Sequence, residues 1–319
     1  MSEPPYQPRL ESHTTMIPVR DSLYQIRSWG PADGEPLVLL HGSRDTSITF
    51  QFMVDSLKHP WRVIAPDWRG HGGSESAERG GWFHDYLADL SIILDTLFPA
   101  TPVNVLGHSL GGNLASSFAG LRPERVRQLI AIDAFGLMPS HPEAVVDILT
   151  KWLLGVSGQR TPQKLYTSFE QMAQALHKAN HRLTMDKAAF LALKSSRRAS
   201  PGTFAWAFDN GWRRSIPAFH SLDEWVACWS RIRAPALWIG AGDPMAGTVR
   251  ADLNTLRRVL AHIGHQRTIF LSQTGHNLHH DSPHVLAAVI ESFLTAPSDQ
   301  KMRAAMKAAG DRIVPFPNE

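Results

Sequence analysis

The segment from Gly107 to Gly111 reads Gly-His-Ser-Leu-Gly and contains the serine best placed to act as a nucleophile. A run of β-branched and aliphatic residues precedes it and a run of helix formers follows, so the pattern predicts a strand, a tight turn and a helix with Ser109 at the apex. Glycines on both sides let strand and helix pass closely. The helix N-terminus below favours developing negative charge. A phosphate-binding turn is the alternative interpretation.

A serine hydroxyl is a poor nucleophile near neutral pH, so Ser109 needs a base and a group that orients the base. His276 follows the last predicted strand in the loop Gln273-Thr-Gly-His276 and is the expected base. Asp243 follows Gly240-Ala-Gly at the end of another predicted strand and is the favoured acid. Asp133 also ends a strand and is the alternative. The chain order Ser109, Asp243, His276 predicts a catalytic triad.

Two backbone amides are expected to stabilise the oxyanion that forms when a carbonyl is attacked. The loop after the apolar run Pro36–Leu40 begins His41-Gly42-Ser43, and the N–H of Ser43 is the first predicted donor. The second is the N–H of Leu110, directly after the nucleophile. Loss of one such donor typically costs about 2–4 kcal/mol of barrier.

Sixteen histidines make any single one weak evidence. His279 and His280 compete with His276, but Gly275-His276 directly follows the last strand and is preferred. A metal site formed by His279, His280 and Asp281 is disfavoured because adjacent histidines point apart. No metal or cofactor is therefore expected. Structural roles are expected for three further histidines: His41, His71 and His108.

The elements that must position these residues alternate between strand and helix, which predicts an α/β fold with a mostly parallel sheet covered by helices on both faces. Apolar runs predict buried strands, and apolar residues at helical spacing predict an amphipathic helix over Trp82–Phe98. The predicted strands are His13–Val19, Ser22–Trp29, Pro36–Leu40, Trp61–Asp67, Val103–Gly107, Arg127–Asp133, Pro235–Asp243 and Gln266–Leu271.

The alternation stops between Phe135 and Arg233, where helical patterns dominate. We expect an inserted helical cap over residues 135–234, a core formed by residues 1–134 and 235–298, and a C-terminal tail over residues 299–319. The tail carries a short basic helical segment, Lys301–Ala309. The helices expected in the cap are Pro142–Leu154, Thr161–Ala179, Met185–Ser195 and Ser221–Ser230.

Composition is that of an ordinary globular protein: 319 residues, 43% hydrophobic, 19% charged and a formal net charge of +3. Arginine pairs are scattered, so nucleic-acid binding is not expected. The N-terminus lacks the pattern of a signal peptide, and no apolar run suits a membrane span. Cys228 is the only cysteine, which excludes an intrachain disulfide. A cytoplasmic protein acting on a small molecule is expected, with a homodimer left open.

The motifs together resemble the α/β-hydrolase superfamily. The matching segments are His41-Gly42, Asp67-x-Arg69-Gly70-x-Gly72-x-Ser74, Gly107–Gly111, Gly240-x-x-Asp243 and Gly275-His276. The chain is similar to the serine-hydrolase-like proteins, near the epoxide hydrolase and haloalkane dehalogenase branch. Those two enzyme classes carry aspartate where this chain has Ser109. The resemblance implies an eight-stranded, mostly parallel sheet with an inserted helical cap.

The resemblance also implies a serine esterase or related acyl hydrolase. We expect hydrolysis of a small carboxylic ester through an acyl-Ser109 intermediate. Aromatic residues in the cap favour a hydrophobic substrate. The alternatives are a C–C bond hydrolase, a lactonase or a cofactor-free perhydrolase with the same triad, and a non-catalytic ligand-binding member of the fold, since fold alone does not choose among them.

Overall fold

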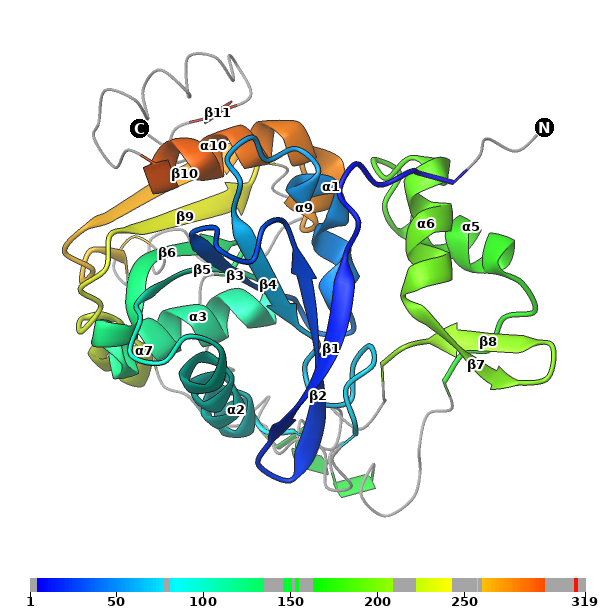
Figure 1. Cartoon of the computed structure of the whole chain (residues 1–319), viewed down its shortest axis with the longest axis horizontal. Helices are drawn as coiled ribbons and strands as arrows, with labels where there is room; N and C mark the ends of the chain where they lie inside the picture. The colour runs from blue at the N-terminus through cyan, green and yellow to red at the C-terminus, as the bar shows by residue number, and fades with distance from the viewer. Residues whose placement is uncertain are drawn as a thin grey trace.

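The computed structural model has a twisted sheet at its centre with helices on both sides (Figure 1). It describes residues 5–76, 81–134, 146–147, 149–150, 153–154, 163–208, 222–242, 257, 260–295 and 313–314. Nine of the described strands form one sheet: β1 His13–Val19, β2 Ser22–Trp29, β3 Pro36–Leu40, β4 Arg62–Pro66, β5 Val103–His108, β6 Val126–Ile132, β9 Ala236–Ala241, β10 Gln266–Leu271 and β11 Ile313–Val314.

The strand order is β1-β2-β4-β3-β5-β6-β9-β10-β11. The six consecutive strands β4, β3, β5, β6, β9 and β10 run parallel to one another, whereas β1, β2 and β11 pair antiparallel. The mostly parallel sheet predicted from the sequence is confirmed. The short strand β11 adds a ninth member to the eight that were expected. The carboxyl ends of the parallel strands meet at one edge of the sheet, where open α/β folds place their sites.

Each face of the sheet has its own core because successive side chains of a strand point to opposite faces. In β3, Leu37 and Leu39 pack on one side and Val38 and Leu40 on the other. The helices over the first face are α1 Gln51–Val54, α9 Leu278–Asp281 and α10 Pro283–Thr295. Those over the second are α2 Phe83–Leu97, α3 Leu110–Leu121 and α7 Leu222–Trp229. Helix α2 matches the predicted helix to within one residue at each end.

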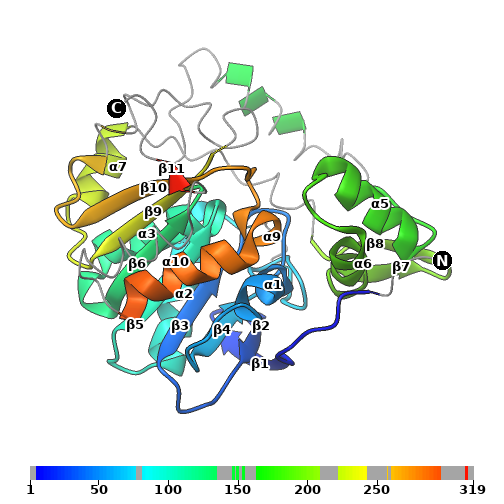
Figure 2. The same ribbon diagram turned by 90° about the horizontal axis from the view of Figure 1, so that it is seen from above.

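Within the segment predicted as a cap, the helices α5 Phe169–Ala179 and α6 Met185–Lys194 lie to one side of the sheet (Figure 2). The same segment also holds an antiparallel hairpin of β7 Ser196–Ser200 and β8 Thr203–Trp206, which the sequence did not predict. Helix α7, placed in the cap by the sequence, packs against α3 in the core. Most of the predicted helix over 142–154, and the tail segment 301–309, lie outside the described residues.

Among the described residues, three hydrogen bonds connect this segment to the loops after β3 and β4 and to α9. Thr46 Oγ1 lies 3.0 Å from Ser195 Oγ. The Gly72 N–H donates to the Ala207 carbonyl at 2.6 Å. Asn180 Nδ2 donates to Asp281 Oδ1 at 2.7 Å.

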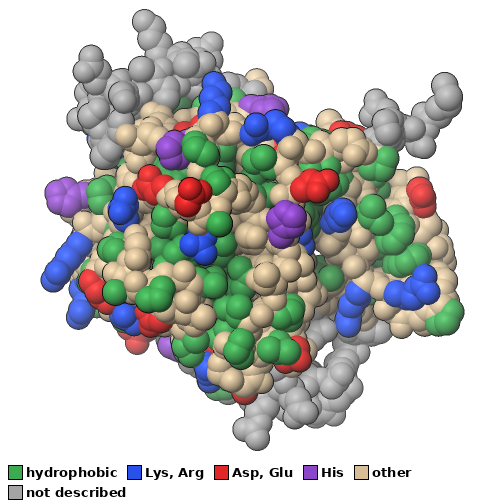
Figure 3. All heavy atoms as spheres, in the orientation of Figure 1, with side chains coloured by type: hydrophobic (Ala, Val, Ile, Leu, Met, Phe, Trp, Pro, Cys, Tyr) green, Lys and Arg blue, Asp and Glu red, His purple; other side chains and the backbone are tan. Residues whose placement is uncertain are grey.

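Charged side chains of both signs are interspersed on the face shown in Figure 3. Within the described residues, no helix combines the length and the apolar character that a membrane crossing requires.

Candidate active site

Ser109 lies between the end of β5 and the first residue of α3, in a strained backbone conformation with φ 53° and ψ −118°. Its N–H donates to the Ile132 carbonyl of β6 at 3.0 Å, and its carbonyl accepts from the Asn113 N–H of α3 at 3.0 Å. Such a conformation persists only where the surrounding structure enforces it. Here the hydrogen bond to β6 on one side and the hydrogen bond to α3 on the other hold the turn.

The two flanking glycines allow this turn because backbone atoms occupy the space that side chains would take. A Cβ on Gly107 would lie 2.2 Å from the Gly111 carbonyl oxygen. A Cβ on Gly111 would lie 2.1 Å from the Leu40 carbonyl oxygen of β3. The close approach inferred from the sequence is therefore present, and any larger residue would force β5, α3 and β3 apart.

His276 lies in the loop after β10, with its Nε2 3.0 Å from Ser109 Oγ. The loop is fixed by the Gly275 N–H, which donates to Asp281 Oδ2 at 2.7 Å, and by His108 Nε2, which donates to the His276 carbonyl at 2.8 Å. The His276 side chain is 38% exposed. The loop that carries the imidazole is therefore fixed through its backbone, and the imidazole itself remains partly exposed.

Asp133 supplies the carboxylate that contacts His276, with Asp133 Oδ2 2.5 Å from His276 Nδ1. Asp133 is fully buried and directly follows β6, with φ 44°. Its N–H donates to the Ile239 carbonyl at 2.8 Å, and its Oδ1 accepts from the Ala241 N–H at 3.3 Å. Strand β9 thus holds the carboxylate at its backbone and at its side chain.

The sequence offered two candidates for the acid that orients His276. Asp243, the favoured acid, lies outside the described residues, and the described carboxylate that contacts His276 belongs to the alternative, Asp133. Both candidates suit this position because β6 and β9 are adjacent parallel strands, so residues just past their carboxyl ends reach the same part of the sheet edge. Strand-end position alone does not distinguish them.

The loop after β3 packs against the nucleophile. A Cβ on Gly42 would lie 3.3 Å from Ser109 Cβ, so the residue before Ser43 approaches the turn closely. Leu110 is the first residue of α3. The structure therefore brings the segments of both predicted oxyanion donors, Ser43 and Leu110, to Ser109.

Two buried side chains of the loop after β4 hold the loop after β3 in place. Asp67 Oδ1 accepts from the Ser47 N–H at 2.6 Å, and His71 Nε2 accepts from the Arg44 N–H at 3.3 Å. Asp67 also accepts from the Gly73 N–H at 3.1 Å, which fixes its own loop. The glycine-rich motif around Asp67 therefore supports the candidate oxyanion loop, and no role in phosphate binding is needed to explain it.

Buried histidines line up behind His276. The ring of His108 lies 4.7 Å from that of His276 and 4.5 Å from that of His279, between ring centroids. The ring of His280 lies 4.2 Å from that of His279. Burial lowers the pKa of His108 and of His280, each to about 3. These rings are therefore neutral near pH 7, and His108 is packed and bonded to backbone as the sequence predicted.

Asp45 lies beside this row of histidines, in the loop after β3. Its Oδ1 accepts from the Thr46 N–H at 2.9 Å. Removal from water raises the pKa of the Asp45 carboxyl to about 7, because burial penalises the charged form.

Asp281 and Asn180 were assigned no positioning role in the sequence analysis. Asp281 binds the Gly275 N–H with one oxygen and Asn180 Nδ2 with the other, so it connects the His276 loop to the end of α5. The residues are 101 positions apart in the chain. A polar residue in a loop is a weak signal, so only the structure identifies this pair.

Comparisons with known proteins agree with the fold. A serine hydrolase-like protein of Danio rerio is 28% identical over 277 residues, covering 83% of each chain. A serine hydrolase-like protein of Mus musculus is 24% identical over 288 residues, covering 84% of this chain and 91% of its own.

Two solved structures share the fold. The thioesterase domain from the curacin biosynthetic pathway superposes with a TM-score of 0.75 at 23% identity, over 88% of this chain and 99% of its own. An esterase from Mycobacterium tuberculosis superposes with a TM-score of 0.72 at 21% identity, over 91% and 94%. The family profile described as alpha/beta hydrolase fold matches residues 35–283, which include the strands β4 to β10 and every residue of the site. The chain therefore belongs to the α/β hydrolase fold family.

Proposed function

We propose that this protein is a serine hydrolase that cleaves carboxylic esters through an acyl-Ser109 intermediate. The observation that carries the proposal is the continuous chain of contacts from Ser109 Oγ to His276 Nε2 and from His276 Nδ1 to Asp133 Oδ2, at 3.0 and 2.5 Å. A nucleophile, a base and a group that orients the base are the three parts that acyl transfer to serine requires.

In the acylation step, Ser109 Oγ attacks the ester carbonyl carbon and His276 Nε2 takes the hydroxyl proton. Asp133 accepts the His276 Nδ1–H, which fixes the tautomer and stabilises the imidazolium. The N–H groups of Ser43 and Leu110 stabilise the oxyanion. When the tetrahedral intermediate collapses, the bond to the alkoxy group breaks and His276 returns the proton to the leaving alcohol.

In the deacylation step, water replaces the alcohol. His276 takes one proton from the water as its oxygen attacks the acyl carbon, and the second tetrahedral intermediate releases the carboxylic acid. The proton returns to Ser109 Oγ, so the enzyme ends as it began. The open side of His276, which is 38% exposed, is where ester and water would enter.

The relatives support a hydrolase of this type. The curated relatives are described as serine hydrolase-like proteins, and structural neighbours include esterases and a thioesterase domain. Their names agree with serine acyl chemistry, and their diversity leaves the acyl and alcohol groups of the substrate open.

A hydrophobic substrate is the proposed class. Of the aromatic residues in the predicted cap, Trp225 and Trp229 are buried in the core against α3, so they are not candidates for the substrate pocket. Phe208 lies 6.4 Å from His71 between ring centroids, which places it beside the loop that supports residues 43–47. Phe208 is therefore the described cap aromatic best placed to contact an acyl or alcohol group.

The test is covalent labelling with a fluorophosphonate, together with hydrolysis of p-nitrophenyl esters. The wild-type chain should be labelled at Ser109, and Ser109→Ala should lose both labelling and turnover. The matched control is Ser56→Ala, because Ser56 Oγ also contacts a histidine, His284 Nδ1, at 2.9 Å but lies in another part of the fold. The control should keep labelling and turnover. Ester hydrolysis that survives in Ser109→Ala would contradict the proposal.

Other substrates separate the remaining candidate functions. Carbon–carbon bond hydrolysis predicts cleavage of dienone-type ring-fission products, and the lactonase and perhydrolase alternatives predict turnover of lactones or of peroxide with a carboxylic acid. Labelling at Ser109 with turnover only on these substrates would keep the nucleophile and replace the ester. A wild-type chain that neither reacts with the fluorophosphonate nor turns over any of them would favour a ligand-binding role.

A further inference from the structure

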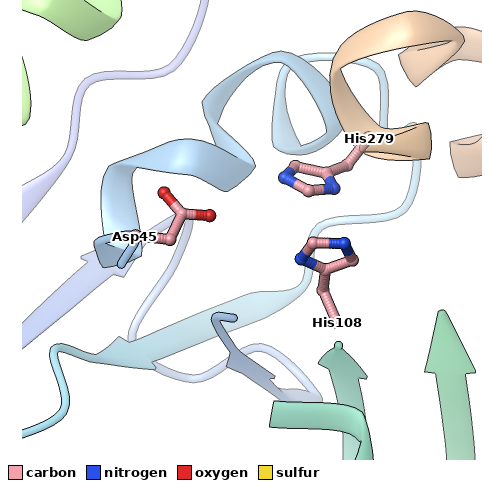
Figure 4. A group of neighbouring side chains, drawn as sticks. All are labelled: Asp45, His108 and His279. Atoms are coloured by element: carbon pink, nitrogen blue, oxygen red, sulfur yellow. The ribbon is translucent and has the colours of Figure 1, made fainter. Parts of the chain in front are cut away.

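Three potential metal ligands from different segments meet behind the candidate active site. Asp45 comes from the loop after β3, His108 from the end of β5 and His279 from α9, and the Asp45 carboxylate faces the two imidazoles (Figure 4). One ligand atom of each lies within 4.8 Å of those of the other two. The two histidines are buried and Asp45 is half-buried.

One nitrogen of each imidazole has no hydrogen-bond partner. His108 Nε2 donates to the His276 carbonyl, so it carries the proton, and His108 Nδ1 is left with an unused lone pair. His279 Nε2 contacts Thr49 Oγ1 at 2.9 Å, and His279 Nδ1 is buried without a partner. An unsatisfied buried polar atom typically costs about 1–3 kcal/mol. Two such nitrogens in neighbouring rings, His108 Nδ1 and His279 Nδ1, indicate that a bound ligand would stabilise this region.

The donor set selects the kind of ligand. Two imidazoles and one carboxylate suit Zn²⁺ and neighbouring transition-metal dications, whereas Mg²⁺ and Ca²⁺ prefer oxygen ligands. Tetrahedral bonds of about 2.0–2.1 Å place ligand atoms roughly 3.4 Å apart. Atoms that already lie within 4.8 Å of one another reach that spacing through small side-chain rotations. Asp45 is the one partly exposed residue of the three, so a metal ion would reach the site from its side. Three protein ligands leave the fourth tetrahedral position to water.

We propose that Asp45, His108 and His279 form a binding site for a transition-metal dication, with Zn²⁺ as the representative ion. This group differs from the combination of His279, His280 and Asp281 considered from the sequence. Of those three, only His279 takes part, because β5 and the loop after β3 supply the other two ligands. Asp281 is engaged by Gly275 and Asn180.

The test is Zn²⁺ binding to the full-length chain after treatment with a chelator, measured by isothermal titration calorimetry. The wild type should bind one equivalent. Asp45→Asn and His279→Gln should each weaken binding by about 100-fold or more, since removal of even an outer-shell partner costs 10–100-fold. The matched control is His280→Gln, which removes the neighbouring buried imidazole and should keep wild-type affinity. Thermal melting of each metal-free variant verifies that it is folded.

Substitution of His276 distinguishes this site from metal bound at the candidate base. The proposal expects His276→Gln to retain Zn²⁺ binding. Binding that is lost in His276→Gln and kept in His279→Gln would overturn it, as would a wild type that binds no Zn²⁺. Co²⁺ titration gives an independent readout, because its visible absorption reports imidazole coordination and should change in His279→Gln but not in His280→Gln.

A second expectation rests on the proposed esterase function. His108 donates to the His276 carbonyl and its Nδ1 lies 3.1 Å from the position of a Cβ on Gly42. Rotation of His108 toward a metal would therefore shift both His276 and the candidate oxyanion loop. Zn²⁺ should slow ester hydrolysis reversibly in the wild type and less in Asp45→Asn. If the chain hydrolyses no ester, calorimetry still decides the metal site.

Discussion

Two of the three residues in the candidate triad hold backbone conformations that L-amino acids avoid. Ser109 has φ 53° and Asp133 has φ 44°. Both are held by hydrogen bonds to neighbouring strands, from the Ser109 N–H to Ile132 and from the Asp133 N–H to Ile239. Backbone strain of this kind concentrates at functional sites, where the surrounding fold enforces it. Nucleophile and acid are thus pre-positioned by the sheet.

Substitution of the two candidate aspartates identifies the acid that orients His276. Asp133→Asn should lower kcat for ester hydrolysis by about 10⁴-fold, because an amide no longer fixes the productive tautomer of His276. Asp243→Asn should lower kcat by less than about 10-fold on the same argument, since the contact to His276 is made by Asp133. Steady-state kinetics of the two variants decides. A larger loss in Asp243→Asn would restore the acid first favoured from the sequence.

Single residues differ in how well the sequence predicts their roles. Ser109 is marked by glycines whose spacing has a steric cause, and His276 by its position directly after the last predicted strand. The structure places the two side chains in contact. The carboxylate has no such mark, because any aspartate after β6 or β9 reaches the same edge. The surroundings of Asp45 cannot be predicted from the sequence either, since they depend on His108 and His279, which lie far away in the chain.

At the scale of elements, the site depends on the close crossing of β3, β5 and α3. Gly111 lies where α3 passes the end of β3, and a Cβ at this position would meet the Leu40 carbonyl oxygen at 2.1 Å. Backbone atoms of a central strand cannot move aside without loss of ladder hydrogen bonds. The crossing is therefore a property of the backbone more than of side-chain packing.

Gly111→Ala should consequently lower the free energy of unfolding by about 3 kcal/mol, the upper end of typical overpacking costs. Gly264→Ala is the matched control, because no heavy atom lies within 4 Å of a Cβ at that position. The free energy of unfolding of the control should stay within about 0.5 kcal/mol of the wild-type value, as is usual for surface substitutions. Urea unfolding curves of both variants test the pair, and equal destabilisation would refute the steric account.

Elements with strong periodicity are the ones that the sequence predicts best. Helix α2 was expected over Trp82–Phe98 and extends from Phe83 to Leu97. The hairpin of β7 and β8 was missed because β7 reads Ser-Arg-Arg-Ala-Ser, with four exposed residues and no alternation of apolar and polar side chains. Its pairing is set by tertiary contacts, including the bridge between Tyr166 and Phe204.

At the scale of the whole molecule, buried histidines make stability depend on pH. His41 is fully buried, with Nδ1 donating to the Gly42 carbonyl at 2.7 Å and Nε2 accepting from the Trp68 N–H at 3.0 Å. A second ring proton would point at the Trp68 N–H. Burial holds the pKa of His41 well below its usual value of 6.5. Just below pH 6.5, His41 therefore stays neutral in the folded chain, whereas in the unfolded chain it binds a proton.

Stability should fall as the pH drops below the unfolded pKa, because protonation then favours the unfolded state. For His41 alone, the loss between about pH 7.5 and about pH 5.5 is roughly 1.4 kcal/mol. His41→Gln can keep both hydrogen bonds without titrating, so its free energy of unfolding should change less over the same interval. Urea unfolding at the two pH values measures the difference, and identical losses in both proteins would exclude His41 as a source.

The attachment of the cap segment has an evolutionary consequence. The candidate catalytic residues come from the loops after β3, β5, β6 and β10. No single short stretch of the chain contains all of them, so exchange of one short segment cannot transfer the whole site. Residues 163–208, in contrast, form one contiguous stretch between the neighbouring strands β6 and β9. Their hydrogen bonds to Thr46, Gly72 and Asp281 connect this stretch to the loops after β3 and β4 and to α9. Recombination that exchanges this stretch leaves the sheet ladder intact. Exchange of a single gene segment can therefore replace residues 163–208 while the candidate catalytic residues are retained.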